Sequence, residues 1–498
     1  MKHIQKQSIK SFLVIGIGFV LGALNLLILF PRILSKEQIG LTRLIMDLGL
    51  VLGTLATLGV IPVIYKFFPF YKHHLSKKEN DLPFISVLVA IIGCLLITTL
   101  VIVFKVPLQS MFVKNSALFI PYYYTIIPFA ICYTLFTVVE AFAWGTGKMV
   151  ESNFLKETFT RFFTTILVIV LLFGLIKFDF FVVLFSLLYF FPAFILSLII
   201  KRTKQIPFNI GLSKVSRRLG NKMIVFSSFI FFSTVLNVVA RTLDSVLIAS
   251  LQNIGDMAVF AIASYFTNLL DIPQRSITSV TIPILAEHWR NKKMDKIESI
   301  YKKSAVELLI IGVVISGCIV LNIHNVIRFL PQGKGYEAIA IPILILLASK
   351  LIDLGTGINN QVIGTSNYWR FDFVTNLIYT ICAVPLNFFL IKYYGINGAA
   401  VANLIAIIIY NSIRFVFIYK KFGMQPFTLK SICILLFGCI AGTIAHFIPV
   451  ISNLFIDGIL RTPAFIILFG TLILSFKISE DSQVIFNKIL GFIGIKKL

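Results

Sequence analysis

The chain alternates long runs of apolar residues with short polar segments along nearly its whole length. A helix needs about 20 apolar residues to cross the hydrocarbon core of a bilayer. Runs of about that length recur throughout, which predicts fourteen membrane-spanning helices. Their predicted ranges are 11–30, 41–67, 83–104, 117–144, 159–176, 178–200, 223–251, 258–286, 305–329, 338–359, 371–391, 398–419, 431–451 and 461–476.

The composition agrees with this pattern, since 58% of the 498 residues are hydrophobic and only 13% are charged. A soluble protein of this size needs a more polar surface, so lipid must cover most of the exterior. The predicted fold class is an all-α polytopic membrane protein. The first apolar run follows Lys2, Lys6 and Lys10, as in a secretion signal, but it is too long and lacks a small-residue cleavage site. We therefore expect it to be retained as the first helix.

The formal net charge of +24 raises the question of a nucleic-acid partner. The basic residues lie in short segments between the apolar runs, most densely in 201–222 and 287–303. If the N-terminus is cytoplasmic, most of these segments are cytoplasmic too, as the positive-inside rule requires. We expect no nucleic-acid partner, and contacts with membrane lipids instead. The predicted location is the inner membrane, with both termini in the cytoplasm.

Two halves of the chain show an internal repeat. Two dipeptides and one pair of basic residues recur 219 positions apart, and a further dipeptide recurs 215 positions apart, each at the same place relative to the predicted helices. The pairs are Gly145-Thr146 with Gly364-Thr365, Lys201-Arg202 with Lys420-Lys421, Pro207-Phe208 with Pro426-Phe427, and Ile39-Gly40 with Ile254-Gly255.

This repeat predicts two lobes of six helices, residues 1–204 and 205–421, followed by two extra helices and a tail at 422–498. Because six helices separate equivalent positions, both lobes insert with the same orientation. A pseudo-two-fold axis along the membrane normal then relates them, which is a known transporter architecture.

Charged residues inside membrane spans are costly and usually face a cavity or a partner. The second lobe has three such pairs at helical spacing, namely Arg241 with Asp244, Asp271 with Arg275, and Lys350 with Asp353. One interpretation is a polar cavity for a pyrophosphate-linked sugar, with the three cations as anion contacts. The alternative is that each pair neutralises itself within its own helix, since the six charges cancel.

The first lobe carries fewer candidates. Arg43 and Asp47 are four positions apart, as are Glu157 and Arg161, and these spacings also fit interfacial pairs. Asp47 or Glu140 could carry a coupling proton or bind sodium. Asn25 in the first span is a candidate substrate contact, although interhelical bonding is the commoner role of such residues.

The sequence offers no sign of a metal site or of catalysis. The six cysteines lie in apolar runs without paired spacing, and the histidines show no ligand pattern. No nucleophile elbow, acidic metal motif or Gly-rich phosphate loop appears. We therefore expect no cofactor and no enzymatic activity.

Three stretches carry a resemblance to a known family: 30–41, 357–366, and Asn387 followed by 394–402. The last is the most specific, because it contains Gly395-Ile396-Asn397-Gly398 followed by two alanines. With these features the chain resembles the polysaccharide-exporter branch of the MOP superfamily, the Wzx-type O-antigen and capsule flippases.

The resemblance implies a two-lobe transporter that moves an undecaprenyl-pyrophosphate-linked oligosaccharide across the inner membrane by alternating access. Its expected partners are the lipid-linked oligosaccharide, membrane lipids and other polysaccharide assembly proteins. Alternatives are a lipid II flippase, a multidrug or cation antiporter of the same superfamily, and a membrane polysaccharide polymerase. The usual Arg-Asp pair of lipid II flippases is absent from the first span, and the multidrug exporters typically have twelve helices.

Overall fold

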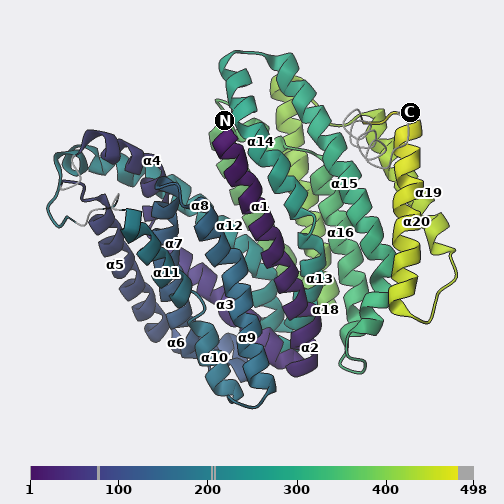
Figure 1. Ribbon diagram of the computed structural model, residues 1–498, viewed down its shortest axis with the longest axis horizontal. Helices are drawn as coiled ribbons and strands as arrows, with labels where there is room; N and C mark the ends of the chain where they lie inside the picture. Colours follow the sequence, from purple (N-terminus) through teal and green to yellow (C-terminus); the bar gives the residue numbers. More distant parts are fainter. Residues whose placement is uncertain (1, 76–78, 204–205, 207–208, 480–498) are drawn as a thin grey trace. The chain divides into compact units, whose positions relative to one another are not determined.

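The computed structural model describes residues 2–75, 79–203, 206 and 209–479 (Figure 1). Every regular element within these ranges is an α-, 3-10 or π-helix, which confirms the all-α prediction. The chain divides into two compact units, Met1–Ala261 (unit 1) and Ile262–Leu498 (unit 2). The two units are described separately below.

Unit 1 holds twelve α-helices, several of them short, among its described residues. They are α1 (Lys2–Ala23), α2 (Phe30–Ile33), α3 (Lys36–Ala56), α4 (Val60–His74), α5 (Leu82–Val103), α6 (Lys105–Val113), α7 (Ile126–Gly145), α8 (Met149–Asn153), α9 (Thr160–Leu172), α10 (Phe178–Ser186), α11 (Phe190–Thr203) and α12 (Lys214–Leu251). The π-helices are η1 (Leu24–Leu29) and η4 (Phe154–Phe159), and the 3-10 turns are η2 (Ala117–Phe119) and η3 (Tyr123–Thr125).

The helix α13 (Ile254–Asn268) crosses from unit 1 into unit 2. The remaining helices belong to unit 2. They are α14 (Asp271–Arg290), α15 (Met294–Phe329), η5 (Tyr336–Ile339), α16 (Ala340–Gly355), α17 (Asn359–Gly364), α18 (Trp369–Phe422), α19 (Leu429–His446) and α20 (Leu454–Ser475).

Eleven helical segments of the described chain are long and apolar enough to cross a membrane. One of them, Arg370–Phe422, contains both predicted spans 371–391 and 398–419. Gly395, with a φ of 57°, forms a kink between the two. The predicted span 258–286 is divided between α13 and α14, and the predicted span 159–176 holds the helix α9, which ends at Leu172. The protein is therefore a multi-pass membrane protein, with several spans broken where the sequence predicts one continuous helix.

The break in the predicted span 41–67 has a clear local cause. Leu58 and Gly59 both adopt positive φ angles, 45° and 79°, so α3 ends and α4 begins on either side of them. Glycine takes this left-handed conformation without the steric cost that a side chain brings. The chain can therefore change direction within the span.

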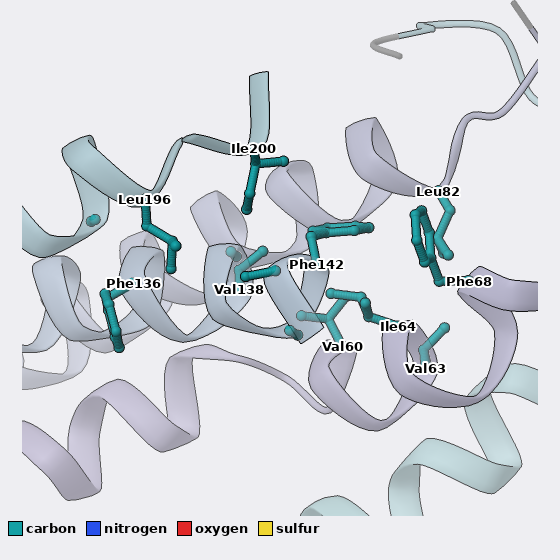
Figure 2. Packing of buried hydrophobic residues seen from close by; sticks show 14 of the residues in the cluster. Val60, Val63, Ile64, Phe68, Leu82, Phe136, Val138, Phe142, Leu196 and Ile200 are labelled. Carbon is teal, nitrogen blue, oxygen red and sulfur yellow. The ribbon is translucent and has the colours of Figure 1, made fainter. Parts of the chain in front are cut away.

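Unit 1 has a core formed by α4, α5, α7, α11 and the first part of α12 (Figure 2). Phe68 and Phe142 meet edge to face, with ring centroids 5.4 Å apart. The Tyr71 hydroxyl shares a hydrogen bond of 2.6 Å with Ser216 Oγ, which ties α4 to α12. Most residues of α7 are buried, and the polar residues Thr134 and Glu140 are among them.

The two copies of the repeated Ile-Gly dipeptide meet within unit 1. A Cβ placed on Gly40 would lie only 1.8 Å from the carbonyl oxygen of Ile254, and one on Gly255 would lie 3.3 Å from Glu37 Oε1. Glycine at these sites lets the start of α3 approach the start of α13 closely. Equivalent positions of the repeat thus contact each other.

In unit 2, α19 and α20 pack side by side against α15 (Figure 1). Small residues permit this, since a Cβ on Gly317 would meet the Phe465 ring at 2.2 Å and one on Gly438 would meet Val313 at 2.4 Å. The two helices after the predicted lobes are therefore an integral part of unit 2.

The division into compact units falls at Ala261, whereas the repeat predicts lobes of residues 1–204 and 205–421. The difference arises because α12 packs against α3 and α4 of unit 1. The lobe boundaries based on the repeat stay a prediction.

Candidate functional site

Two charged clusters lie on the apolar helices, one in each unit. We name them the Lys350 cluster (Asp271, Gln274, Arg275, Lys350, Asp353 and Asn411) and the Glu140 cluster (Tyr65, Tyr133, Glu140, Trp144, Lys156, Glu157, Arg161 and Tyr189). The first joins α14, α16 and α18, and the second joins α4, α7, η4, α9 and the turn before α11.

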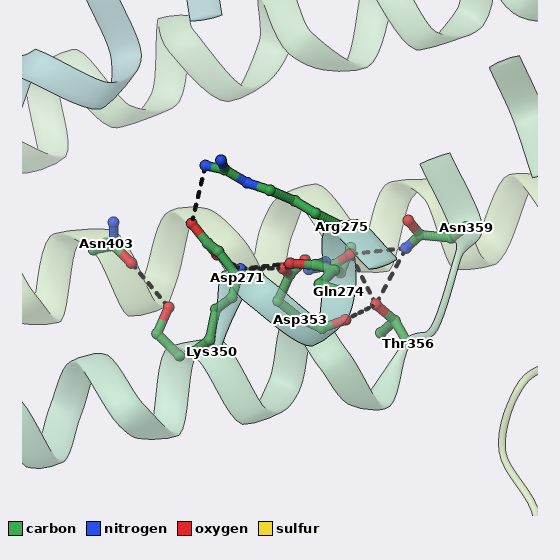
Figure 3. A network of polar contacts seen from close by, with 10 residues as sticks. Asp271, Gln274, Arg275, Lys350, Asp353, Thr356, Asn359 and Asn403 are labelled. Atoms are coloured by element: carbon green, nitrogen blue, oxygen red, sulfur yellow. Dashed lines mark hydrogen bonds and ion pairs between the residues drawn. The ribbon is translucent and has the colours of Figure 1, made fainter. Parts of the chain in front are cut away.

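In the Lys350 cluster one ammonium group sits between two carboxylates (Figure 3). Lys350 Nζ lies 2.6 Å from Asp271 Oδ1 on α14 and 3.2 Å from Asp353 Oδ2 on its own helix α16. It also donates a 2.7 Å hydrogen bond to Gln274 Oε1. The sequence predicts pairing within each helix, but the shortest ion pair of this cluster joins two helices.

Amide groups complete the bonding of Asp353. Gln274 Nε2 donates to Asp353 Oδ2 at 3.1 Å, and Asn411 Nδ2 donates to Asp353 Oδ1 at 3.3 Å. Asn411 Oδ1 in turn accepts from Asn359 at 2.7 Å and from Thr356 at 3.0 Å. A carboxylate bonded in this way stays charged at low cost, so the network holds Asp353 in place.

Arg275 is left almost free by this arrangement. Its nearest carboxylate oxygen, Asp271 Oδ2, is 3.9 Å away, because Lys350 engages the other oxygen of Asp271. The Arg275 side chain is 66% exposed, although it lies inside the predicted span 258–286. If Arg275 lies within the membrane, as the predicted span 258–286 places it, its exposed guanidinium requires water or an anion beside it.

The third predicted pair belongs to unit 1. Arg241 is exposed and Asp244 is half-buried, both on α12 of unit 1, whereas Asp271, Arg275, Lys350 and Asp353 belong to unit 2. The prediction that all six residues share one cavity stays a prediction.

In the Glu140 cluster, the Glu140 carboxylate accepts two hydrogen bonds from Lys156 Nζ, at 3.0 and 3.3 Å. Glu140 is buried, with 4% exposure, and Lys156 retains 32% side-chain exposure. One turn further, Glu157 and Arg161 pair at 3.1 Å. The sequence pattern missed Lys156 as the partner of Glu140, because the two lie on different helices and share no helical spacing.

The aromatic members surround these charges. The rings of Tyr65 and Trp144 lie 5.6 Å apart, and those of Tyr133 and Tyr189 lie 5.1 Å apart. Tyr133 and Tyr189 lie within electrostatic range of both Glu140 and Lys156. A cluster of rings around compensated charges can bind a ligand that has both apolar faces and polar edges.

Two further predicted residues have structural partners. Asn25, in the π-helix η1, donates to the Arg161 carbonyl at 2.9 Å and accepts from Thr165 at 2.7 Å. Asp47 is buried and pairs with Arg43 at 2.9 Å. The bonds of Asn25 join two helices, which was the alternative to a substrate contact. The roles of Asn25 in substrate binding and of Asp47 and Glu140 in ion coupling stay predictions.

The sequence pattern also missed a buried cation in unit 2. Arg414 is almost fully buried, pairs with Asp372 and donates to Thr375 at 3.1 Å. Its guanidinium carbon lies 3.8 Å from the centre of the Tyr410 ring. These residues come from the two arms of α18 on either side of Gly395, so no short-range spacing links them. Within the described ranges, no group of three His, Cys, Asp or Glu residues could hold a metal ion.

The fold has been seen in solved transporters. The structure "Lipid II flippase MurJ, inward closed conformation" aligns with a TM-score of 0.72 and 14% identity, over 94% of this chain and 99% of that one. A multidrug resistance MATE family transporter of the MOP superfamily aligns with a TM-score of 0.62 and 14% identity, over 83% and 94% of the two chains. A MOP superfamily transporter from Pyrococcus furiosus gives 0.54 and 14%, over 84% and 96%.

These likenesses define the class: a polytopic helical membrane protein with the MOP-superfamily fold. Within it, the chain belongs to the family described as "Polysaccharide biosynthesis protein", whose model matches residues 4–289. The resemblance found in the sequence is thereby confirmed. No curated protein sequence matches this chain.

Proposed function

We propose that the protein is a flippase that moves an undecaprenyl-pyrophosphate-linked oligosaccharide, an O-antigen, capsule or exopolysaccharide repeat unit, across the inner membrane by alternating access. The observation that carries the proposal is the exposed guanidinium of Arg275 in the Lys350 cluster, where Lys350 is the nearer partner of both carboxylates. Lys350 holds both carboxylates, which leaves Arg275 to bind a phosphate group. The planar guanidinium suits phosphate oxygens well.

The fold comparison supports a cargo with a lipid anchor. The lipid II flippase covers 94% of this chain, whereas the multidrug transporter covers 83%. The greater coverage agrees with a functional role for α19 and α20. These two helices follow the two predicted six-helix lobes and pack on α15. A lipid II flippase is the second candidate on this ground, although the first span lacks the Arg-Asp pair of that group.

In an alternating-access mechanism, the contact between Gly40 and Ile254 would have a functional role. Gly40 and Ile254 approach at a point where a side chain on Gly40 could not fit. With the N-terminus cytoplasmic, this contact lies toward the outer leaflet, so it would close the outer side in this state. It would separate when the cargo leaves.

Deletion of the gene in its host tests the proposal. We expect loss of the surface polysaccharide and accumulation of its lipid-linked precursor, both reversed by the wild-type gene and not by the Arg275→Gln variant. Normal surface polysaccharide in the deletion strain, together with new sensitivity to cationic drugs, would instead favour the multidrug antiporter.

A further inference from the structure

The Glu140 cluster presents its groups on one face of α7. Tyr133, Glu140 and Trp144 are separated by seven and four positions, which places them on a common stripe of the helix. Phe136, on the same side of the helix, and Phe142, on the opposite side, are both buried in the core of unit 1 (Figure 2). Packing on both sides of α7 holds the stripe in place.

Two aromatic rings of the Glu140 cluster, one on α4 and one on α7, are partly exposed. Tyr65 is 44% exposed and Trp144 is 42% exposed, with their ring centroids 5.6 Å apart. The Trp144 indole N–H already donates to Ser152 Oγ at 2.9 Å, which fixes the ring and satisfies its polar edge. The remaining surface of Trp144 is an apolar face of fixed orientation.

The charges beside these rings are balanced. Glu140 is paired with Lys156 and Glu157 with Arg161, so the four groups sum to zero. One guanidinium nitrogen of Arg161, Nη1, is buried without a hydrogen-bond partner among the described residues. The cluster thus has polar groups to offer and no surplus charge to attract an anion.

Lipid alone does not account for this surface. Lipid-facing aromatic residues can sit among apolar neighbours, as Phe190, Phe191 and Phe194 do on α11, where they are 44 to 56% exposed. Glu140 and Lys156 lie within electrostatic range of Tyr65, and ionised groups there would be costly against acyl chains. The exposed rings of the Glu140 cluster therefore face an aqueous or ligand-filled space.

A sugar ring matches this combination of groups. Its C–H bonds form apolar faces that pack on an aromatic ring, and its hydroxyls both donate and accept hydrogen bonds around the edge. Carboxylate, ammonium and phenol groups at the margin of an aromatic surface satisfy such hydroxyls, as expected of a site that is mainly apolar with a few placed polar groups.

We propose that the Glu140 cluster is a binding subsite for uncharged sugar residues of the cargo, with Trp144 and Tyr65 as the stacking surface and Glu140 and Lys156 as hydroxyl partners. This inference rests on the proposed flippase function. It assigns the glycan to the Glu140 cluster of unit 1.

Trp144 provides its own reporter, since the chain has only three tryptophans. In the full-length Trp289→Phe/Trp369→Phe variant, Trp144 is the sole source of indole fluorescence. The probes are lipid-linked oligosaccharide extracted from membranes of the deletion strain, and undecaprenyl pyrophosphate without sugar. We expect the oligosaccharide probe to change the Trp144 emission and the bare pyrophosphate to leave it unchanged.

Affinity measurements on otherwise wild-type protein give the second readout. Trp144→Ala should weaken binding of the oligosaccharide probe roughly fivefold, because a stacked ring contributes about 1 kcal/mol. Trp144→Phe should retain most of the affinity, and neither change should affect binding of bare undecaprenyl pyrophosphate. Phe194→Ala, an exposed ring outside the cluster, is the matched control and should bind both probes normally.

The outcomes separate the two proposals. If the wild type binds both probes but Trp144 does not respond and Trp144→Ala binds normally, the sugar subsite is wrong and the flippase proposal stands. If the wild type binds neither probe, the flippase proposal itself is wrong, and the subsite falls with it.

Discussion

Both charged clusters place ionised groups on apolar helices, but the charges are compensated differently in each. In the Lys350 cluster one cation serves two carboxylates from two helices, and the second cation, Arg275, is left exposed. In the Glu140 cluster each cation has one carboxylate, and aromatic rings surround the pairs. The first arrangement has a cation to offer to an anion, whereas the second offers ring faces and hydrogen bonds. The two proposals above use this contrast, with phosphate assigned to Arg275 and sugar to the Glu140 cluster.

Removal of the shared cation should damage the fold most. In the Lys350→Met variant, Asp271 and Asp353 face each other without their common partner, and we expect a loss of about 3 kcal/mol in the free energy of unfolding. Chemical denaturation in detergent measures it. The double variant Lys350→Met/Asp353→Asn should regain most of the loss. A Lys350→Met protein as stable as the wild type would show that the three charges are not coupled.

The one-to-one pair should be less sensitive. Glu140→Ala removes the partner of Lys156, but Lys156 is 32% exposed and can turn its ammonium group toward water. We expect a loss of about 1 to 2 kcal/mol. A double-mutant cycle with Lys156→Met measures the coupling directly. Coupling as strong as that between Lys350 and Asp353 would remove the contrast between the two clusters.

Asn25 tests whether a residue predicted to bind substrate is structural. Asn25→Leu loses both hydrogen bonds to α9, and we expect destabilisation of about 1 kcal/mol. Any fall in transport should then match the fall in folded protein. Full stability combined with lost transport would place Asn25 at the substrate instead. Asn237→Leu is the matched control, since this asparagine is exposed and bonds only within α12.

Arg275 should contribute least to stability. Its ion pair with Asp271 is 3.9 Å long and its side chain is largely exposed, so Arg275→Gln should change the free energy of unfolding by less than about 1 kcal/mol. Transport should nevertheless be lost, because the phosphate contact is gone, and Arg275→Lys should recover part of it. Loss of folding in place of transport would show that Arg275 supports the structure.

The apolar pattern was sufficient to predict the all-α membrane fold and most spans, because burial in lipid imposes run length and composition directly. It could not predict the breaks at Gly59 and Gly395, since a glycine in an apolar run can be helical or left-handed and only packing decides. It also predicted continuous spans at 159–176 and 258–286, where the structure has shorter helices.

The site was predictable only in part for a related reason. Helical spacing identified Asp271, Arg275, Lys350 and Asp353, since each pair shares one helix. The closest partners come from other helices, as Lys350 with Asp271, Glu140 with Lys156 and Arg414 with Asp372 show. Such long-range pairs leave no period in the sequence, so only the folded chain reveals them.

Transport by purified full-length protein in proteoliposomes tests the proposed function most directly. The substrate is fluorescent lipid-linked oligosaccharide extracted from the deletion strain, and its arrival in the opposite leaflet is followed with a membrane-impermeant quencher. We predict transbilayer movement by the wild type and none by the equally stable Arg275→Gln variant. Equal rates with the wild type, the variant and protein-free vesicles would contradict a flippase.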